Sequence, residues 1–385
     1  MTLPPADLVI RDVTIYPGDG APFSGSVVVR GGAIAAVERG SEAHVSAAEA
    51  IDGRGKFLIP GLWDMHVHAR ASENDGLELG AFTSHGVTSV RDLGGYVDRL
   101  KAAQVGGTVG PAIYSSFSTL NGKAFARFQR AVTTEAELRT AVDDMARAGA
   151  VQIKIHRAFP AALLPVAARL AHERGLTLTG HIPLGVHPLA ACEAGMDGIE
   201  HVGSFLEAYI SVTPKATADD AIAYMLSGAA EGLYRCLASR RVAVTPTLVV
   251  YPAVARDRGK GTISAEAERF IGGLKRIALR LHEAGVPLLS GTDTSDVGGL
   301  TIAPGASLLD ELEMLQGAGI AARDVIAMAT VNAARVLALE GKTGSIAPGK
   351  AADFVLLDAD PGADIGNARK QVAVYRAGRR VIDQR

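Results

Sequence analysis

Both ends of the chain carry short apolar runs of the length typical of β-strands. Near the N-terminus, runs at 27–30 and 33–37 are separated only by Gly31-Gly32, and near the C-terminus two further runs are separated by Ala377-Gly378. A two-residue turn that contains glycine between apolar runs is typical of a β-hairpin. Neither end is long enough to form a stable domain by itself, so we expect the two ends to pair into one sheet.

Between these ends, short apolar strands alternate with amphipathic helices, a pattern that favours parallel β/α units. One helix is predicted at 135–147 with Thr134 as its N-cap, a second at 165–174 and a third near 322–339. Eight strands are predicted, at 62–68, 87–92, 112–117, 151–156, 176–181, 198–202, 242–247 and 287–293. Eight such units favour a closed barrel over an open sheet.

The predicted fold class is therefore α/β: a (β/α)8 TIM barrel with a composite β-sandwich domain formed by the N- and C-terminal segments. The barrel would occupy residues 60–341, and the sandwich residues 1–59 and 342–385. The 385 residues, 48% of them hydrophobic, are sufficient for both units. The segment 207–241 is longer than a minimal connection, and we expect it to cover the site as a lid.

The balance of charge indicates a small-molecule partner. The formal net charge of -2 provides no electrostatic footprint for nucleic acid or for an anionic membrane. No apolar run approaches the length of a membrane span, and the first residues lack the pattern of a secretory signal. We expect a cytoplasmic homo-oligomer that contacts neither nucleic acid nor membrane.

Only two cysteines occur, Cys192 and Cys236, and neither lies in a paired spacing. This spacing excludes a disulfide framework or a thiolate zinc site as the organising principle of the fold. Any metal site must then use nitrogen and oxygen ligands.

Polar residues with metal chemistry lie at the C-terminal ends of the predicted strands, where barrels of this kind carry their active sites. His66 and His68 share one strand face because side chains at i and i+2 point the same way. The full set of candidate ligands is His66, His68, Lys154, His181, His201 and Asp293. A single histidine on an apolar strand is more often a core residue, but six such residues on five strands predict a metal site.

Lys154 is the most unusual of these residues. Together with Gln152 and His156 it alternates with apolar positions, so it would face the barrel interior, where an unpaired ammonium is costly. A neutral lysine can react with carbon dioxide, and the resulting carbamate could bridge two metal ions. The alternative is a lysine paired with Asp293 or with a carboxylate of the substrate.

These motifs, in this order, resemble the amidohydrolase superfamily and specifically its binuclear members with a carboxylated lysine. The resemblance rests on 60–68, 86–92, Gly180-His181, 199–201, 290–293 and 344–358. It implies a (β/α)8 barrel on a composite β-sandwich. It also implies that His66, His68 and Asp293 bind one metal ion, that His181 and His201 bind the other, and that carboxylated Lys154 and a hydroxide bridge them.

The resemblance further implies hydrolysis of an amide. The bridging hydroxide would attack the carbonyl of a dipeptide or N-acyl amino acid while Asp293 transfers the proton, with zinc the preferred metal. The run His181 to Leu184 lacks the glutamate of mononuclear deaminases, which disfavours deamination. The chain is most similar to the dipeptidase, carboxypeptidase and imidazolonepropionase-like group, although 118–123 lacks the Gly-Gly-His run often found there.

Two other functions stay open: hydrolysis of a cyclic amide, lactone or phosphotriester, and a catalytically silent interaction protein. Candidates for substrate binding are Arg70, His156 and Tyr251, each with the alternative of a local hydrogen bond. We expect Arg91 and Asp92 to form an ion pair at the end of the second strand. His85 and His172 lie in helical stretches and are expected to be solvated.

Overall fold

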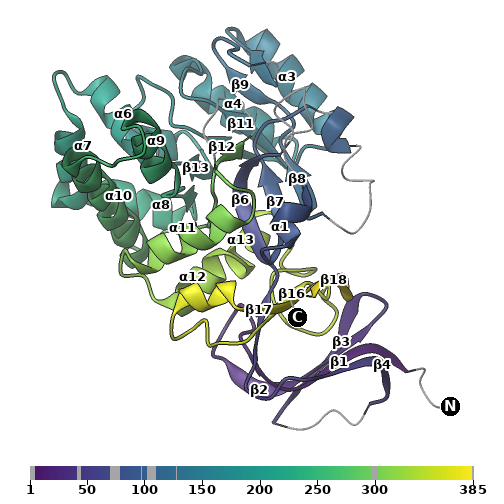
Figure 1. Ribbon diagram of the computed structural model, residues 1–385. Coiled ribbons are helices and arrows are strands. Elements are labelled where there is room, and N and C mark those ends of the chain that lie inside the picture. The colour runs from purple at the N-terminus through teal and green to yellow at the C-terminus, as the bar shows by residue number, and fades with distance from the viewer. Residues whose placement is uncertain are drawn as a thin grey trace.

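A computed structural model describes residues 5–40, 45–69, 79–96, 98–101, 110–126, 128–295 and 302–383 (Figure 1). The two ends of the chain form one eight-stranded sheet in the order β18-β17-β16-β5-β1-β2-β3, and β4 pairs with β1. Its strands are β1 (Ala6–Ile15), β2 (Phe23–Arg30), β3 (Ala33–Arg39), β4 (Ala47–Asp52), β5 (Phe57–Pro60), β16 (Phe354–Leu357), β17 (Gln371–Arg376) and β18 (Arg379–Asp383).

The antiparallel pairing of β5 with β16 joins the two ends, with Pro60 opposite Phe354 and Phe57 opposite Leu357. The expected pairing of the ends is therefore confirmed. The strands belong to one connected sheet because β1 pairs with β2, β4 and β5, and the composite β-sandwich stays a prediction. Its two halves share one apolar cluster, to which Leu8 and Phe354 both belong.

Both predicted hairpins are present. Gly31 and Gly32 link β2 to β3, and Ala377 and Gly378 link β17 to β18; all four residues have positive φ angles, between 47° and 79°. Two consecutive positive φ angles match the right-handed twist of the flanking strands, which is why glycine is favoured in such turns.

The middle of the chain forms two parallel sheets. One has the order β15-β6-β7-β8 and the other β10-β9-β11-β12-β13-β14. Their strands are β6 (Leu62–His68), β7 (Val87–Asp92), β8 (Ala112–Ser115), β9 (Thr119–Asn121), β10 (Gln129–Ala131), β11 (Gln152–Ile155), β12 (Thr177–Gly180), β13 (Gly198–Glu200), β14 (Ala243–Thr245) and β15 (Thr294–Ser295).

Each predicted strand except the last has a counterpart in these sheets. The predicted strand 287–293 contains a single bridge, from Leu288 to Val244. Backbone hydrogen bonds also cross between the sheets, from Val151 N to Ser115 O at 3.0 Å and from Met65 N to Ser290 O at 2.9 Å. The described strands thus form a mixed α/β fold with two sheets, and a single closed barrel stays a prediction.

Helices pack around the parallel strands, as Figure 1 shows. They are α1 (Leu79–Thr83), α3 (Glu135–Ala148), α4 (Leu164–His172), α5 (Pro188–Glu193), α6 (Gly203–Val212), α7 (Ala218–Leu226), α8 (Glu231–Ser239), α9 (Val250–Arg258), α10 (Ala265–Glu283), α11 (Ala306–Gln316), α12 (Ala322–Met328) and α13 (Val331–Val336). Helix α3 begins with the predicted N-cap Thr134, whose side chain accepts from Glu137 N while the Glu137 carboxylate accepts from Thr134 N.

The predicted helix near 322–339 and the predicted lid segment 207–241 are each divided into shorter helices. The stretch near 322–339 divides into α12 and α13 at Thr330, whose hydroxyl donates to Ile326 O at 2.6 Å. The segment 207–241 contains the end of α6 and all of α7 and α8, with Ser227 in extended backbone between the last two. No helix of the described residues is long and apolar enough to cross a membrane.

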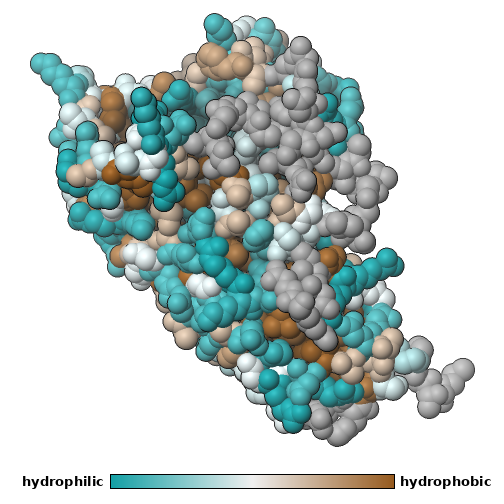
Figure 2. Space-filling model, viewed as in Figure 1, coloured by the Kyte–Doolittle hydropathy of each residue, from teal (hydrophilic) through white to brown (hydrophobic). Residues whose placement is uncertain are grey.

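Cys192 in α5 and Cys236 in α8 form a disulfide bond across a sequence separation of 44 residues. This single bond is not a disulfide framework, but it is a cross-link that the sequence analysis did not predict. Sequence spacing did not reveal the bond because the helices meet only in three dimensions. On the face shown in Figure 2, hydrophilic side chains cover most of the helices, and hydrophobic ones are visible in small patches.

Candidate metal centre

A cavity of about 280 Å³ lies at the C-terminal ends of the parallel strands. It brings together all six predicted metal ligands and the predicted substrate residue His156. Its lining consists of His66, His68, Thr119, Phe128, Gln129, Lys154, His156, His181, His201, Asp293, Ser295 and Ile302. The candidate ligands that alternation along the strands predicted to face the interior therefore line one cavity.

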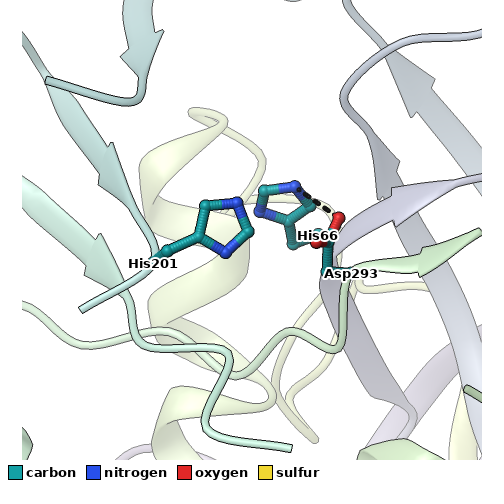
Figure 3. A group of neighbouring side chains, drawn as sticks. All are labelled: His66, His201 and Asp293. Atoms are coloured by element: carbon teal, nitrogen blue, oxygen red, sulfur yellow. Dashed lines mark ion pairs between the residues drawn. The ribbon is translucent and has the colours of Figure 1, made fainter. Parts of the chain in front are cut away.

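His66, His201 and Asp293 form the most compact group in the cavity. One possible ligand atom from each lies within 4.8 Å of the others. Figure 3 shows His66 and Asp293 pointing toward one another with the His201 ring beside them. Oδ1 of Asp293 lies 3.2 Å from His66 Nε2 and 3.4 Å from His68 Nε2, so one carboxylate oxygen faces both imidazoles.

His181 continues this group along the cavity. Its ring centroid lies 4.6 Å from that of His201 and 4.4 Å from that of His156. Burial, and then the neighbouring imidazoles, hold the pKa of His181 well below its ordinary value and lower the pKa of His201 to about 3. Both rings are therefore neutral near neutral pH, which is the form that binds metal ions.

In three histidines of the site, the ring nitrogen Nδ1 contacts a neighbouring oxygen atom. Nδ1 of His66 lies 2.9 Å from Glu200 Oε2, that of His68 lies 2.9 Å from Gly94 O, and that of His201 lies 2.7 Å from Thr247 Oγ1. Contacts of this kind fix the orientation of a ring and leave Nε2 for a metal ion. His66 Nε2 has no hydrogen bond in the described structure, although Asp293 is nearby.

Lys154 lies in β11 between Thr119 of β9 and Thr179 of β12. Its side chain is 1% exposed, and within the described residues Nζ has neither a hydrogen bond nor an ion pair with Asp293. Burial lowers the pKa of Lys154 to about 8, although the charges of Glu200 and Asp293 act in the opposite direction. A buried amine with a lowered pKa is more often neutral and hence nucleophilic.

The backbone is unusual at two of the candidate ligands. His201 and Asp293 have φ angles of 65° and 58°, in the left-handed region that few residues other than glycine adopt. Backbone hydrogen bonds from His201 N to Thr245 O and from Asp293 N to His66 O hold these conformations, at 2.9 and 2.7 Å. Such conformations concentrate at functional sites, where the surrounding structure maintains them.

Glu200 is the residue of this site that sequence reasoning missed. It is fully buried at the end of β13, where it accepts hydrogen bonds from Arg91 Nη2 at 2.6 Å and Thr179 Oγ1 at 2.5 Å in addition to its contact with His66. Burial alone would raise the pKa of Glu200, but Arg91 and His66 bring it well below its ordinary value. A charged residue directly before a candidate ligand on an interior strand was the available signal.

The expected ion pair between Arg91 and Asp92 is absent from the described contacts. Successive residues of a strand point to opposite faces, so Arg91 instead reaches Glu200, Thr245 Oγ1 and Met65 O. Asp92 accepts from Ala69 N at 2.8 Å and from Ser115 Oγ at 2.6 Å.

The two histidines expected to be solvated differ in their surroundings. His172 is partly exposed and bonds to Asp197 at 2.7 Å. His85 is half-buried, and its Nδ1 lies 2.9 Å from Ala81 O.

The three substrate candidates have different positions. His156 lines the metal cavity, and burial lowers its pKa to about 4. Tyr251 lines a separate cavity of about 560 Å³, and its hydroxyl oxygen accepts from Gly203 N at 2.8 Å. Arg70 lies outside the described residues. No residue of the segment 207–241 lines the metal cavity, so the expected lid is not part of its described wall.

The donor set of the cavity suits divalent metal ions. It combines neutral imidazoles with a carboxylate, and three of its buried atoms lack a hydrogen bond within the described chain: His66 Nε2, Lys154 Nζ and His181 Nδ1. Buried polar atoms are nearly always paired, so several unpaired ones around one space indicate a missing partner. Nitrogen and oxygen donors of this kind are typical of zinc and related metals.

Parallel strands that converge on such a cavity define a candidate metal site of the kind found in enzymes. The chain matches the amidohydrolase family over residues 57–381 and belongs to that family. Ochratoxinase of Aspergillus niger is 25% identical over 422 aligned residues, which cover 91% of this chain and 81% of that protein. A shorter match, 45% identical over 65 residues, links 17% of this chain to 11% of an adenine deaminase of Desulforamulus reducens.

Solved structures agree with this assignment. The crystal structure of A. niger ochratoxinase has a TM-score of 0.75 at 22% identity and covers 98% of this chain and 96% of its own. A prolidase complexed with N-methylphosphonate-L-proline has a TM-score of 0.76 at 23% identity, with coverage of 98% and 100%. The fold is thus that of amidohydrolase structures, which are of the TIM-barrel type, and family membership supports a hydrolase.

Proposed function

We propose that the protein is an amidohydrolase with two divalent metal ions that hydrolyses the amide bond of a dipeptide or an N-acyl amino acid. The observation that carries this proposal is the buried Lys154 Nζ, without a partner in the described structure, in the same cavity as five imidazoles and Asp293. A (β/α)8 barrel with this cavity at its C-terminal face is the architecture that we infer.

The ligands divide into two groups. His66, His68 and Asp293 would hold one metal ion, because Asp293 Oδ1 faces both histidines. His181 and His201 would hold the second, because their rings are adjacent and neutral. Lys154, carboxylated by carbon dioxide, would supply two oxygens between the groups, and zinc is the metal that suits these donors best.

Bound metal ions would activate a water molecule and polarise the scissile carbonyl. Asp293 is suited to move the proton. Burial would raise its pKa, but His66 and His201 hold the pKa of this carboxyl well below its usual value, so it is ionised and can accept a proton. Its Oδ1 faces the histidines, and Oδ2 would take the proton from water and deliver it to the leaving nitrogen.

The substrate class rests on the remaining wall and on the relatives. His156 has a low pKa and is a neutral hydrogen-bonding group that could meet the substrate carboxylate or carbonyl. Phe128 and Gln129 line the same cavity and would contact a side chain of the substrate. Several structural relatives are named as prolidase or Xaa-Pro dipeptidase, which favours a small peptide-like amide.

Two measurements test the proposal. Metal analysis after reconstitution with zinc and bicarbonate should find about two equivalents per chain, and less than one equivalent would contradict a binuclear site. A hydrolysis screen should find turnover of dipeptides or N-acyl amino acids. Turnover confined to lactones, cyclic amides or phosphotriesters would overturn the substrate class, and no turnover at full metal occupancy would favour a silent interaction protein.

Replacement of Lys154 by alanine tests the bridge. We expect Lys154→Ala to reduce turnover at least about a hundredfold and to lower the bound metal, because the loss of a direct ligand exceeds that of a supporting contact. Lys370→Ala changes an exposed lysine and should leave both quantities unchanged. Near-normal turnover of Lys154→Ala would mean that the bridge is misassigned.

A further inference from the structure

A second cavity, of about 380 Å³, lies at the opposite end of the parallel strands from the metal centre. It is bordered by Thr177 at the start of β12, Gly198 at the start of β13 and Pro287, whereas the candidate metal ligands follow the ends of the same strands. At about 3.3 Å per residue, His181 lies about 13 Å along the strand from Thr177. The two cavities are therefore separate.

Three basic side chains line this second cavity. Arg241 and Arg335 from α13 are exposed, and Arg91 is buried with 1% exposure. The described contacts include no hydrogen bond or ion pair of the Arg241 side chain, although its neighbour Arg240 reaches Glu193 O. Arg241 has a φ angle of 57° because it is the left-handed residue that follows the C-cap of α8.

Most charged side chains of this cavity already have hydrogen-bond or ion-pair partners. Asp197 lines the cavity, but it accepts from Leu178 N at 2.7 Å and bonds to His172 at 2.7 Å. Arg335 pairs with Asp19. Arg91 uses Nε and Nη2 for its described hydrogen bonds, so its Nη1 has no described partner. Arg241 and this Nη1 thus provide donors for an anion, and Thr177 and Asn332 add neutral polar groups.

Buried Arg91 of this cavity is connected to the metal centre through the carboxylate of Glu200. Arg91 Nη2 and Thr179 Oγ1 both donate to Oε1 of Glu200, while Oε2 of the same group holds His66 Nδ1. An anion drawn to Arg91 would weaken its bond to Glu200. The change would alter how strongly Glu200 orients and polarises the imidazole of His66, and contacts of this kind tune metal affinity.

We propose that this cavity is a binding site for a small oxyanion, such as a phosphate ester or a carboxylate, and that its occupancy changes the metal affinity of the opposite site through Arg91 and Glu200. A volume of about 380 Å³ falls in the range of small-ligand sites. Guanidinium groups are suited to phosphates and carboxylates because their N–H groups bind two oxygens at once. The coupling is reciprocal, so metal binding changes anion affinity by the same factor.

Equilibrium dialysis with radiolabelled sulfate tests the site directly. Sulfate is a tetrahedral dianion, and the measurement uses the metal-loaded protein at constant ionic strength. We expect one equivalent to bind to the wild type and to Arg240→Gln, the adjacent exposed arginine outside the cavity. Arg241→Gln should bind about tenfold more weakly because it loses a charge-assisted hydrogen bond, and Arg241→Lys should recover part of the affinity.

Sulfate bound at the metal centre is distinguished by chelation. Binding that disappears when the metal is removed, and that Arg241→Gln retains, belongs to the metal centre and would overturn the second site. Equal sulfate affinity of Arg241→Gln and Arg240→Gln would also overturn it. These outcomes are independent of whether the protein hydrolyses amides.

The coupling has its own measurement. Sulfate should change the dissociation constant of the divalent metal severalfold in the wild type and in Arg240→Gln, and by much less in Arg241→Gln. The same sulfate dependence in all three proteins would mean that the anion acts elsewhere. Circular dichroism and thermal unfolding of each variant verify that the fold is intact.

Discussion

Glu200 is a buried acidic residue that contacts three side chains in the interior of the parallel strands. Glu200 is ionised and buried. Arg91 provides its counter-charge, and its second oxygen, Oε2, contacts Nδ1 of His66. Removal of one partner of a buried ion pair leaves the other uncompensated, which costs about 3–5 kcal/mol. The same carboxylate therefore contributes to folding and to the orientation of the candidate ligand His66.

The variant Glu200→Gln separates these contributions. We expect the metal affinity to fall about 10- to 100-fold, because a neutral amide supports the imidazole of His66 less strongly. Metal titration followed by equilibrium dialysis measures this loss, and thermal unfolding in chelator measures the destabilisation independently. Glu173→Gln, an exposed change in the Arg169 ion pair, is the control. Unchanged metal affinity in a folded Glu200→Gln protein would exclude the supporting role.

Sequence reasoning located the candidate ligands better than their supports. The i, i+2 rule and the position of strand ends were enough to place His66, His68 and Lys154 in one cavity. Glu200 and Arg91 are 109 residues apart and meet only across the interior, so local pattern could not pair them. Tyr251 follows a strand as expected, yet its hydroxyl turns to the backbone of Gly203.

At the scale of elements, α11 is tied to the connection after β14 by one acidic side chain. Glu311 is fully buried, and its Oε2 accepts from Val249 N at 2.7 Å. Its other oxygen has no hydrogen bond in the described part of the chain. Burial raises the pKa of Glu311 to about 8, so the folded protein holds a proton that the unfolded chain releases near its ordinary pKa of 4.5.

This shift predicts a dependence of stability on pH. An acid whose pKa is raised on folding stabilises the protein fully below its unfolded pKa, and this contribution is lost as the pH rises toward the folded value. The loss is at most about 1.4 kcal/mol for each pH unit between these limits. Glu311→Gln keeps a carbonyl for Val249 N but cannot ionise.

We therefore expect the stability of Glu311→Gln relative to the wild type to increase between about pH 5 and about pH 8. Urea unfolding at the two pH values measures the difference. Glu313→Gln, which alters an exposed glutamate of the same helix, should follow the wild-type pH trend. Parallel trends for the wild type and Glu311→Gln would show that Glu311 does not carry this dependence.

The elements differ in how well pattern predicted them. Helix α3 has a capping box and a following Gly149 with φ 91°, so its limits are encoded locally and were predicted closely. In the stretch near 322–339, the apolar residues recur at helical spacing on both sides of Thr330. The backbone nevertheless departs from a helix at Thr330 because of its place in the tertiary structure. The eighth strand has one bridge, since its hydrogen bonds depend on two neighbours distant in sequence.

At the scale of the whole molecule, the disulfide bond between α5 and α8 is the strongest constraint that was not predicted. A cross-link over 44 residues removes conformational freedom from the unfolded chain, worth about 4 kcal/mol in the chain-entropy treatment. Cys236→Ser should therefore lower the unfolding temperature measured by calorimetry. Reductant should lower it in the wild type to a similar extent and leave the variant unaffected.

A thiol assay under denaturing, non-reducing conditions provides the control. It should find no free thiol in the wild type and one in Cys236→Ser. Two free thiols in the wild type would contradict the bond. Because disulfides persist in oxidising compartments, confirmation of the bond would also count against the expected cytoplasmic location.

The joining of the two ends was predictable because each end alone is too short to bury its strands. The arrangement of the parallel strands as two sheets was not predictable in the same way. It depends on a break at Phe117, whose φ of 60° separates β8 from β9, and on a sparse pairing of 287–293. The alternation of polar and apolar residues predicts which face of a strand a side chain lies on. It does not predict which neighbouring strands complete the backbone hydrogen bonds of that strand.

The pairing of β5 with β16 has a consequence for the order of assembly. Pro60 and Phe354 are partners, and β5 leads within two residues into the strand that carries His66 and His68. During synthesis, β5 has no partner on this side until residues 354–357 leave the ribosome, and the strand of His66 and His68 itself lacks β15 until residues 294–295 have been made. Contacts so distant in sequence form slowly. We therefore expect fragments that end before residue 293 to bind zinc more weakly than the full chain in a metal titration, because they lack Asp293 and β15.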